Sequence, residues 1–433
     1  MWWSCRKGRV VENSLRGGGL VGSMRCSAFS RRMSCLVACA VLLLILRAKD
    51  ACSTDWAFSP SFSASETYDS NINFQFHDKQ SDFITSIKPK LLLTGQSDKD
   101  RFSLDSTVNG MIYARNSQLD RVETFNNAAW IRQWSERFST DLGANFTKTT
   151  ALESQLQEAG LRATLANQYL YNLRAKGTYA LTELVSLSLG GNAGQTWYPE
   201  KQFPNSNSAM GNLTLAWKRS DFDTIGLDWL YSYKHYLDTT TDNVQFFRPG
   251  LYWQHIFSET TSLVVGAGYR FTAISYYQYV FELDPQVRIV KKWFTKTSNT
   301  YDFWATLKKN WSERLSTSLT AGRDQYSDVS AQTFDHMYVG TQIQYGLSEL
   351  TTVNCGLRYD YNAEILRGNQ RWNYVSLSPS IDRKLTGDLT LRLAGSYQYQ
   401  LQDYPMANFS QSADRYVAWV GIVWQLPMLW ASK

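Results

Sequence analysis

Leu389–Gln400 reads LTLRLAGSYQYQ, and its side chains alternate between apolar and polar along the whole stretch. Side chains of a β-strand point to opposite faces in turn, so this pattern gives one apolar and one polar face. Phe138–Thr147 and Thr352–Asn362 show the same alternation. Because the pattern recurs from about residue 54 onward, the sequence predicts an all-β protein with one-sided strands.

Short polar breaks separate pairs of these alternating segments, as tight hairpin turns require. Six share one form: WSERF at 134–138, LTEL at 181–184, FSET at 257–260, WSERL at 311–315, LSEL at 347–350 and LTGDL at 385–389. Two are looser: SDKDRF at 97–102 and KRSDFD at 218–223. Longer connections rich in Asn, Asp, Gln and Gly lie between the breaks, and the longest spans about residues 273–299.

Short turns that alternate with long loops are typical of a transmembrane, antiparallel, up-and-down β-barrel. Lipid offers no hydrogen bonds to the backbone, so the sheet must close. We predict about 18 strands, within a range of 16–18. The alternative, a soluble all-β protein such as a propeller, would repeat in four-stranded blades. The predicted strands cover residues 56–66, 82–95, 101–115, 120–134, 137–150, 164–180, 184–198, 208–218, 222–236, 242–257, 261–273, 300–311, 314–326, 333–346, 350–363, 371–384, 388–402 and 414–426.

Five aromatic residues stand at or just before a short turn, at one end of their strands. Rings in this position form the girdle that lies at the headgroup level of a membrane. A soluble sandwich gives no reason for such placement. The predicted periplasmic girdle consists of Trp134, Trp217, Phe257, Trp311 and Tyr345.

The N-terminal region has the form of an export signal. Cys35–Leu46 is an apolar run of 12 residues that follows Arg25, Arg31 and Arg32. It is shorter than the ~20 residues of a membrane-spanning helix and matches the apolar region of a signal peptide. Ala51-Cys52-Ser53 gives a small-x-small cleavage site. We expect residues 1–53 to be a signal peptide with an upstream extension, and 54–433 a single domain; a buried helix is the alternative.

Charge and cysteine content exclude several classes. Residues 1–53 hold nine Lys and Arg and two acids, so 35 basic and 36 acidic residues remain after them, and the formal charge of +6 belongs mostly to the signal. The basic pI therefore does not indicate nucleic-acid binding. Only Cys355 follows residue 53, which leaves no disulfide framework and no multi-Cys metal site.

The start of the predicted domain resembles a known family. Phe58–Phe74 reads FSPSFSASETYDSNINF, and Ser81–Leu93 reads SDFITSIKPKLLL. These strings are similar to the N-terminal strands of the β-barrel porins encoded in exopolysaccharide gene clusters. The resemblance implies a bacterial outer-membrane barrel associated with polysaccharide secretion, with polysaccharide and periplasmic export proteins as partners. The tail departs from the usual aromatic ending of such barrels, since Pro427–Lys433 follows Trp424-Gln425-Leu426.

No catalytic, metal or cofactor motif is found in the sequence, which predicts a protein that is not an enzyme. The chain has four histidines, and only His336 is predicted to point inward, near the outer end of its strand. An outer-membrane lipid or glycan hydrolase that uses His336 is the alternative. No cofactor is expected.

Charged residues on the polar faces are predicted to line the lumen. They either pair across strands and brace the barrel, or attract anionic solutes. Tyr113, Tyr252 and Tyr338 are also predicted to face inward, to fill the lumen or to stack on sugar rings. A conduit associated with exopolysaccharide secretion, a porin for small solutes and a docking barrel remain open, with residues 273–299 as the candidate plug. The predicted inward bases are Lys88, Lys90, Arg115, Arg132, Lys234, Arg248, Arg270, Lys308, Arg358 and Arg392, and the acids are Asp105, Asp141, Asp228, Asp302, Asp324 and Asp360.

Overall fold

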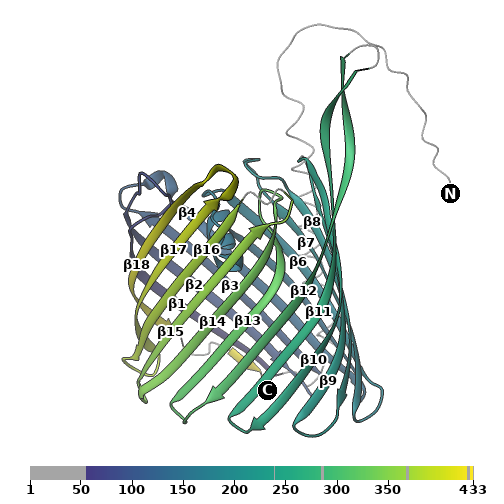
Figure 1. Ribbon diagram of the computed structural model, residues 1–433. Coiled ribbons are helices and arrows are strands. Elements are labelled where there is room, and N and C mark those ends of the chain that lie inside the picture. Colours follow the sequence, from purple (N-terminus) through teal and green to yellow (C-terminus); the bar gives the residue numbers. More distant parts are fainter. Residues whose placement is uncertain (1–54, 238, 284–286, 367–369, 427–429, 433) are drawn as a thin grey trace, which may run out of the picture. The chain divides into compact units, whose positions relative to one another are not determined.

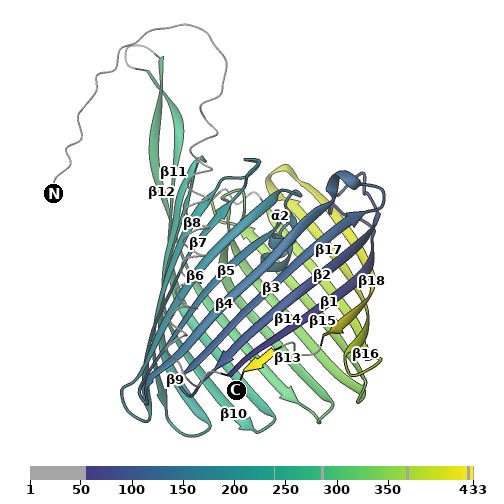
Figure 2. The ribbon, with the colours of Figure 1, turned by 180° about the vertical axis from the view of Figure 1, so that it is seen from behind.

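The computed structural model describes residues 55–237, 239–283, 287–366, 370–426 and 430–432. They form one antiparallel sheet in which consecutive strands are hydrogen-bonded neighbours. The first strand pairs with the second and also with the last two, so the sheet closes into a barrel (Figures 1 and 2). The predicted signal peptide lies outside the described residues.

The barrel wall has 18 strand positions, as predicted. The last position is filled by two strands: β18 ends at Gln425, and the three-residue β19 continues the pairing with β1. The strands are β1 Asp55–Asp69, β2 Asp82–Gln96, β3 Asp100–Tyr113, β4 Arg121–Ser135, β5 Phe138–Thr150, β6 Asn167–Ala180, β7 Val185–Trp197, β8 Ser206–Lys218, β9 Asp223–Tyr236, β10 Thr241–Ser258, β11 Thr261–Leu283, β12 Val287–Asn310, β13 Leu315–Ser327, β14 Thr333–Ser348, β15 Thr351–Glu364, β16 Arg371–Lys384, β17 Leu389–Tyr404, β18 Phe409–Gln425 and β19 Trp430–Ser432.

The eight predicted turns are confirmed, because each joins two consecutive strands within four residues or fewer. They all lie at one end of the barrel, which we call the short-turn end (the lower end in Figure 1). The connections at the opposite, long-loop end are longer and include the helix α2 (Ala151–Ala159) and the 3-10 turns η2 (Ser117–Leu119) and η3 (Pro405–Ala407). No helix among the described residues is long and apolar enough to cross a membrane.

The prediction of a loop over 273–299 is wrong. β11 and β12 continue through most of this stretch and stay paired from Thr261–Lys309 to Leu283–Val287. The two strands, of 23 and 24 residues, rise beyond the barrel as a ribbon (Figure 1). The segments YYQYVFEL and VRIVKKWF are rich in aromatic and β-branched residues, which favour strands over loops. The described residues of this ribbon rise away from the barrel in Figure 1, so this part of the candidate plug lies outside the lumen.

The outward face of the wall is apolar. Leu393 is 46% exposed, Leu357 50% and Leu189 65%, although all three lie within strands. Outward-facing residues around the barrel include Ile87, Leu91, Leu173, Leu213, Leu227, Leu251, Leu319, Val339, Ile343, Leu377, Ile381 and Val420. A continuous apolar surface of this kind requires hydrocarbon around it rather than water.

The buried apolar residues form separate clusters inside the barrel at the long-loop end, rather than a core between two sheets. Leu152 and Leu156 of α2 pack with Phe74 from the β1–β2 connection and Tyr374 from β16. The next cluster joins α2 to Val329 of the β13–β14 connection. The long-loop end is therefore filled by connections that fold inward.

Candidate functional site: the polar lumen and its constriction

Most of the predicted inward charges form ion pairs along the lumen wall. The N–O distance is 2.6 Å for Lys90–Asp105, 2.7 Å for Arg248–Asp228 and 3.3 Å for Arg270–Asp302. Arg358 pairs with Asp360 at 2.7 Å, Arg174 approaches Asp141 at 3.7 Å, and Arg392 pairs with Asp382. All of these contacts except Arg358–Asp360, which lies within β15, join neighbouring strands and so brace the wall. Lys88 and Lys308 line cavities and have no ion pair among the described residues.

Two predicted lumen residues lie elsewhere. Arg132 is opposite Asp100 on the face that carries Trp130 and Phe102, which is the outward face near the short-turn end. Its side chain lies over the Trp134 ring, with 4.4 Å to the ring centroid. Arg115 follows the end of β3 in an exposed connection, where its backbone N–H donates to Asp82. Neither residue therefore lines the lumen.

The five predicted girdle residues are all exposed, and they stand at the short-turn end. Their exposed fractions run from 42% for Tyr345 to 60% for Trp311. Trp134, Trp217, Phe257 and Tyr345 lie within three residues of their strand's end, and Trp311 directly follows β12. This geometry suits rings that lie in a membrane interface.

The helix α2 lies inside the lumen, and its local sequence explains why it forms. Thr150 is the N-cap and accepts a hydrogen bond from the backbone N–H of Glu153. Gly160 ends the helix in the left-handed conformation, with φ of 63°. Thr150 and Glu153 have the spacing of a capping box, and glycine is the common residue after a helix end. The signal was present in the sequence, but the strand pattern around it concealed it.

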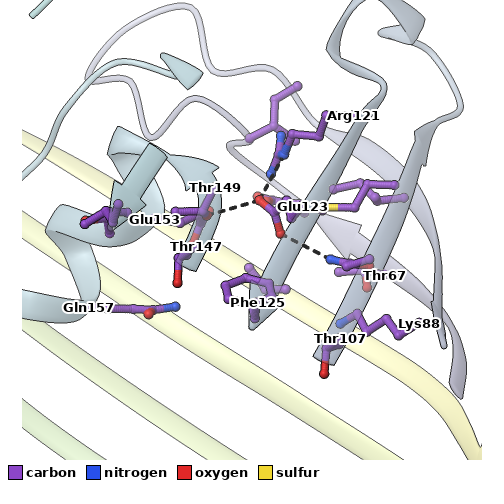
Figure 3. A pocket seen from close by; sticks show the side chains of 18 of the residues that line it. Thr67, Lys88, Thr107, Arg121, Glu123, Phe125, Thr147, Thr149, Glu153 and Gln157 are labelled. Atoms are coloured by element: carbon purple, nitrogen blue, oxygen red, sulfur yellow. Dashed lines mark hydrogen bonds and ion pairs between the residues drawn. The ribbon is translucent and has the colours of Figure 1, made fainter. Parts of the chain in front are cut away.

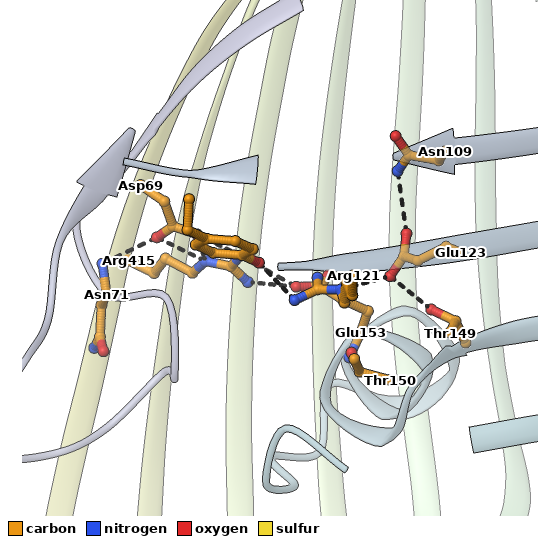
Figure 4. Close-up of polar contacts among 10 residues, drawn as sticks. Asp69, Asn71, Asn109, Arg121, Glu123, Thr149, Thr150, Glu153 and Arg415 are labelled. Atoms are coloured by element: carbon orange, nitrogen blue, oxygen red, sulfur yellow. Dashed lines mark hydrogen bonds and ion pairs between the residues drawn. The ribbon is translucent and has the colours of Figure 1, made fainter. Parts of the chain in front are cut away.

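The N-terminal turn of α2 is held by an arginine of the final strand. Arg415 of β18 donates to Glu153 at 3.1 Å and to Asp69 of β1 at 2.6 Å (Figure 4). Its side chain is 10% exposed and that of Asp69 1%. One guanidinium thus fixes the helix and also ties β18 to β1, where the barrel closes.

The C-terminal end of α2 is held by three side chains of β15 and β17. Arg358 donates to the carbonyl oxygens of Gln157 and Glu158, the second at 2.8 Å. Asn362 donates to the carbonyl of Ala159 at 2.8 Å, and Gln400 donates to that of Gly160. These are the carbonyls that a helix leaves without partners at its end. Because α2 is held at both ends in this way, it forms a fixed constriction of the lumen.

A cavity of about 720 Å³ remains between α2 and the wall formed by β1 to β6 and β18 (Figure 3). Glu153, Ser154, Gln157 and Glu158 line it on the helix side. The facing wall contributes basic and acidic groups, with Lys88 and Arg121 among the bases. The cavity is therefore lined by charges of both signs, as in a passage for polar solutes.

Glu123 is the centre of the polar network on that wall. It accepts from Arg121 and Asn109 at 3.2 Å and from Thr149 at 3.3 Å (Figure 4). Arg121 also donates to the Tyr113 hydroxyl at 2.5 Å. Asn109 and Tyr113 lie on β3, Arg121 and Glu123 on β4, and Thr149 on β5. The network therefore makes three neighbouring strands rigid where they face the helix.

A second cavity, of about 460 Å³, lies against β8 to β14. Tyr252, Trp304 and Tyr338 line it together with Asp228 and Arg248. Tyr252 and Tyr338, which the sequence predicts to face inward, both line this cavity. Trp304 was missed, because its neighbours Tyr301 and Phe303 are also large and aromatic and obscure the alternation.

His336 has no free nitrogen in this arrangement. Nδ1 lies 2.8 Å from Asp324 and Nε2 lies 2.7 Å from Asp360. Both carboxylates accept, so both nitrogens donate, which is the bonding of an imidazolium. The residue is 4% exposed. In this geometry it joins β13, β14 and β15 through side-chain hydrogen bonds. Among the described residues, no group of three or more His, Cys, Asp or Glu could hold a metal ion.

The connections at the long-loop end contain buried ionisable groups. Asp328, between β13 and β14, is held by backbone N–H groups of Ser330 and Gln332. Burial raises the pKa of its carboxyl to about 7, against the hydrogen bonds and the charge of Lys234, which lower it. Burial likewise raises the pKa of Tyr198, in the connection after β7. In both groups desolvation disfavours the charged form.

Together these features describe a closed antiparallel barrel with a polar lumen, narrowed by an inserted helix. No protein-family model matches the chain, and no curated protein matches it. Among solved structures, it is similar to OccAB2 of Acinetobacter baumannii (TM-score 0.45, 10% identity, covering 86% of this chain and 98% of that one). It is similar to OpdQ of Pseudomonas aeruginosa (0.44, 10%, 87% and 98%) and to the ferric-catecholate import receptor Fiu from E. coli K12 (0.44, 6%, 85% and 81%).

Proposed function

We propose that the protein is an outer-membrane channel for polar solutes, in which α2 sets the width of the passage. One observation carries the proposal: the wall is apolar outside and charged inside, and a helix held at both ends leaves a polar cavity beside it. A barrel of this strand number is wide enough for water, so the inserted helix is what limits solute size.

The finer parts of the proposal rest on sequence. Residues 1–53 would direct export as a cleaved signal, and the short-turn end would face the periplasm. The resemblance of Phe58–Phe74 to porins of exopolysaccharide clusters supports a role in polysaccharide secretion, with periplasmic export proteins as partners. Glycosyltransferase and polysaccharide-exporter genes beside this one would support that role.

Conductance of the purified barrel in planar lipid bilayers tests the channel. We expect discrete open steps whose size is lowered by small neutral polymers that enter the passage but not by larger ones, because α2 excludes the larger ones. A folded barrel that inserts but never conducts would contradict the proposal. Co-purification of a periplasmic protein with such a silent barrel would favour a docking role instead.

A further inference from the structure

Three aromatic residues and three glycines alternate in one row across the lumen face of β9 to β14. Gly226 is opposite Tyr252, Tyr252 opposite Gly266, and Gly266 opposite Trp304. The row continues from Trp304 to Gly322 and from Gly322 to Tyr338. Because partners across strands point to the same face, all three rings face the lumen.

Each ring lies over the glycine of the preceding strand. A Cβ atom on Gly226 would lie 2.1 Å from Cε1 of Tyr252, and one on Gly266 would lie 2.1 Å from Cε2 of Trp304. A Cβ on Gly322 would lie 2.5 Å from the Tyr338 hydroxyl. The glycines are therefore what allows the rings to lie down along the wall. The rings repeat every second strand, a spacing of about 10 Å.

Polar side chains border this row on both sides. Toward the long-loop end lie Asp228 and Asp302, and Arg248 is stacked on Trp304 with 4.4 Å to the ring centroid. Asp228 Oδ1 and Arg248 Nε are buried and have no hydrogen-bond partner among the described residues. Toward the short-turn end lie the polar side chains of Gln254 and Thr306.

From this arrangement we propose that the row is a binding track for a linear glycan. Sugar rings present C–H faces that pack on flat aromatic rings, and hydroxyl edges that bond to planar polar groups beside them. Rings that are regularly spaced along a cavity of about 460 Å³ suit a repeating polymer better than a single small solute. The proposal deepens the channel function and rests on it, because it names the class of solute.

The test is block of the single-channel current by cellohexaose, with a polyethylene glycol of similar length as the probe control. We expect cellohexaose to interrupt the current in resolved closures and the glycol to cause no such closures. Tyr252→Ala should weaken the block about tenfold, which corresponds to about 1.4 kcal/mol. Tyr252→Phe, which keeps the ring, should retain most of it. Tyr301→Ala removes an aromatic ring that is 71% exposed on the outer face of β12 and should change nothing.

Failure of the track and failure of the channel give different results. A conducting barrel that ignores cellohexaose overturns the track and leaves the channel. A silent barrel that binds cellohexaose in equilibrium dialysis, and loses it on Tyr252→Ala but not Tyr252→Phe, overturns the channel and supports the track. A silent barrel that does not bind overturns both. Migration of the unheated variants on SDS gels checks that each one folds.

Discussion

At the scale of the residue, neighbours in the chain meet opposite environments. Leu393 is 46% exposed on the outer face, whereas Arg392 points into the lumen and pairs with Asp382 of β16. Placing a charge on the outer face should therefore cost more free energy of unfolding than removing a charge from the lumen face.

Leu393→Arg is expected to lower the free energy of unfolding by ~2–4 kcal/mol, because it places a charge in hydrocarbon. Arg392→Leu removes a partly exposed ion pair and should cost only ~0–1 kcal/mol. Reversible unfolding in urea, followed by tryptophan fluorescence, measures both. Equal losses would show that the two faces are assigned wrongly.

Asp328 gives the connection between β13 and β14 a pH-dependent stability. Its folded pKa of about 7 lies above the ordinary value of 3.8, so the fold favours the protonated form. Its contribution to stability is complete below about pH 4 and is lost as the pH rises through 7. The groups around it are Lys234, Tyr236 and Glu364.

We expect the connection at 328–332 to exchange its backbone hydrogens faster at pH 8 than at pH 6, beyond the chemical effect of pH. Asp328→Asn keeps the side-chain oxygen that accepts from Ser330 and Gln332 and should remove this excess. Hydrogen exchange read by mass spectrometry measures it, with β16 as the internal reference. An excess that persists in Asp328→Asn would assign it to another group.

Sequence alone placed most side chains on the correct face, and its failures have a physical cause. In β17 the apolar and polar residues alternate without a break, and the parity of Leu393 and Arg392 follows directly. In β4 large apolar residues occupy both faces, with Ile131 inward and Trp130 outward. The alternation there does not show which residues point inward, and the sequence wrongly predicts that Arg132 faces the lumen.

At the scale of the element, the strands and turns were predictable and the lumen insert was not. Periodicity of two runs through nearly every strand, and each short turn is a local signal. The role of α2 depends on contacts with Arg358, Asn362 and Gln400, which lie about 200 residues or more farther along the chain. Contacts between residues so far apart in the chain cannot be inferred from the alternation of apolar and polar residues within one segment.

Replacing residues 151–166 by a short Gly-Ser linker should widen the passage. The barrel keeps every strand pairing, so we expect it to fold and to conduct more current per opening than the unaltered protein. Replacing the exposed residues 405–408 by a linker of the same kind is the matched control and should leave the conductance unchanged. An unchanged conductance in the α2 variant would show that another segment limits the flow.

At the scale of the whole molecule, closure depends on the pairing of β1 with β18. Ser63 is opposite Val423, and both point to the lumen. Opposed Cα atoms in an antiparallel pair are ~4.5–5.5 Å apart, within the range that a disulfide can bridge.

Ser63→Cys with Val423→Cys, in a chain whose other cysteines are serine, is expected to form a disulfide in the folded barrel. The crosslinked chain should run differently from its reduced form on a denaturing gel. Ser63→Cys with Ile422→Cys, whose side chains point to opposite faces, is the control and should stay reduced. Crosslinking of the control alone would mean a different register.

The pairing of β1 with β18 also decides when the wall can be completed. The two strands that meet there are separated by nearly the whole domain, so neither can find its partner while the chain is still emerging. A chain that ends before Phe409 would leave β1 without its antiparallel partner β18. We therefore expect a premature stop before Phe409 to leave an open edge on β1 rather than a slightly narrower barrel of the same kind.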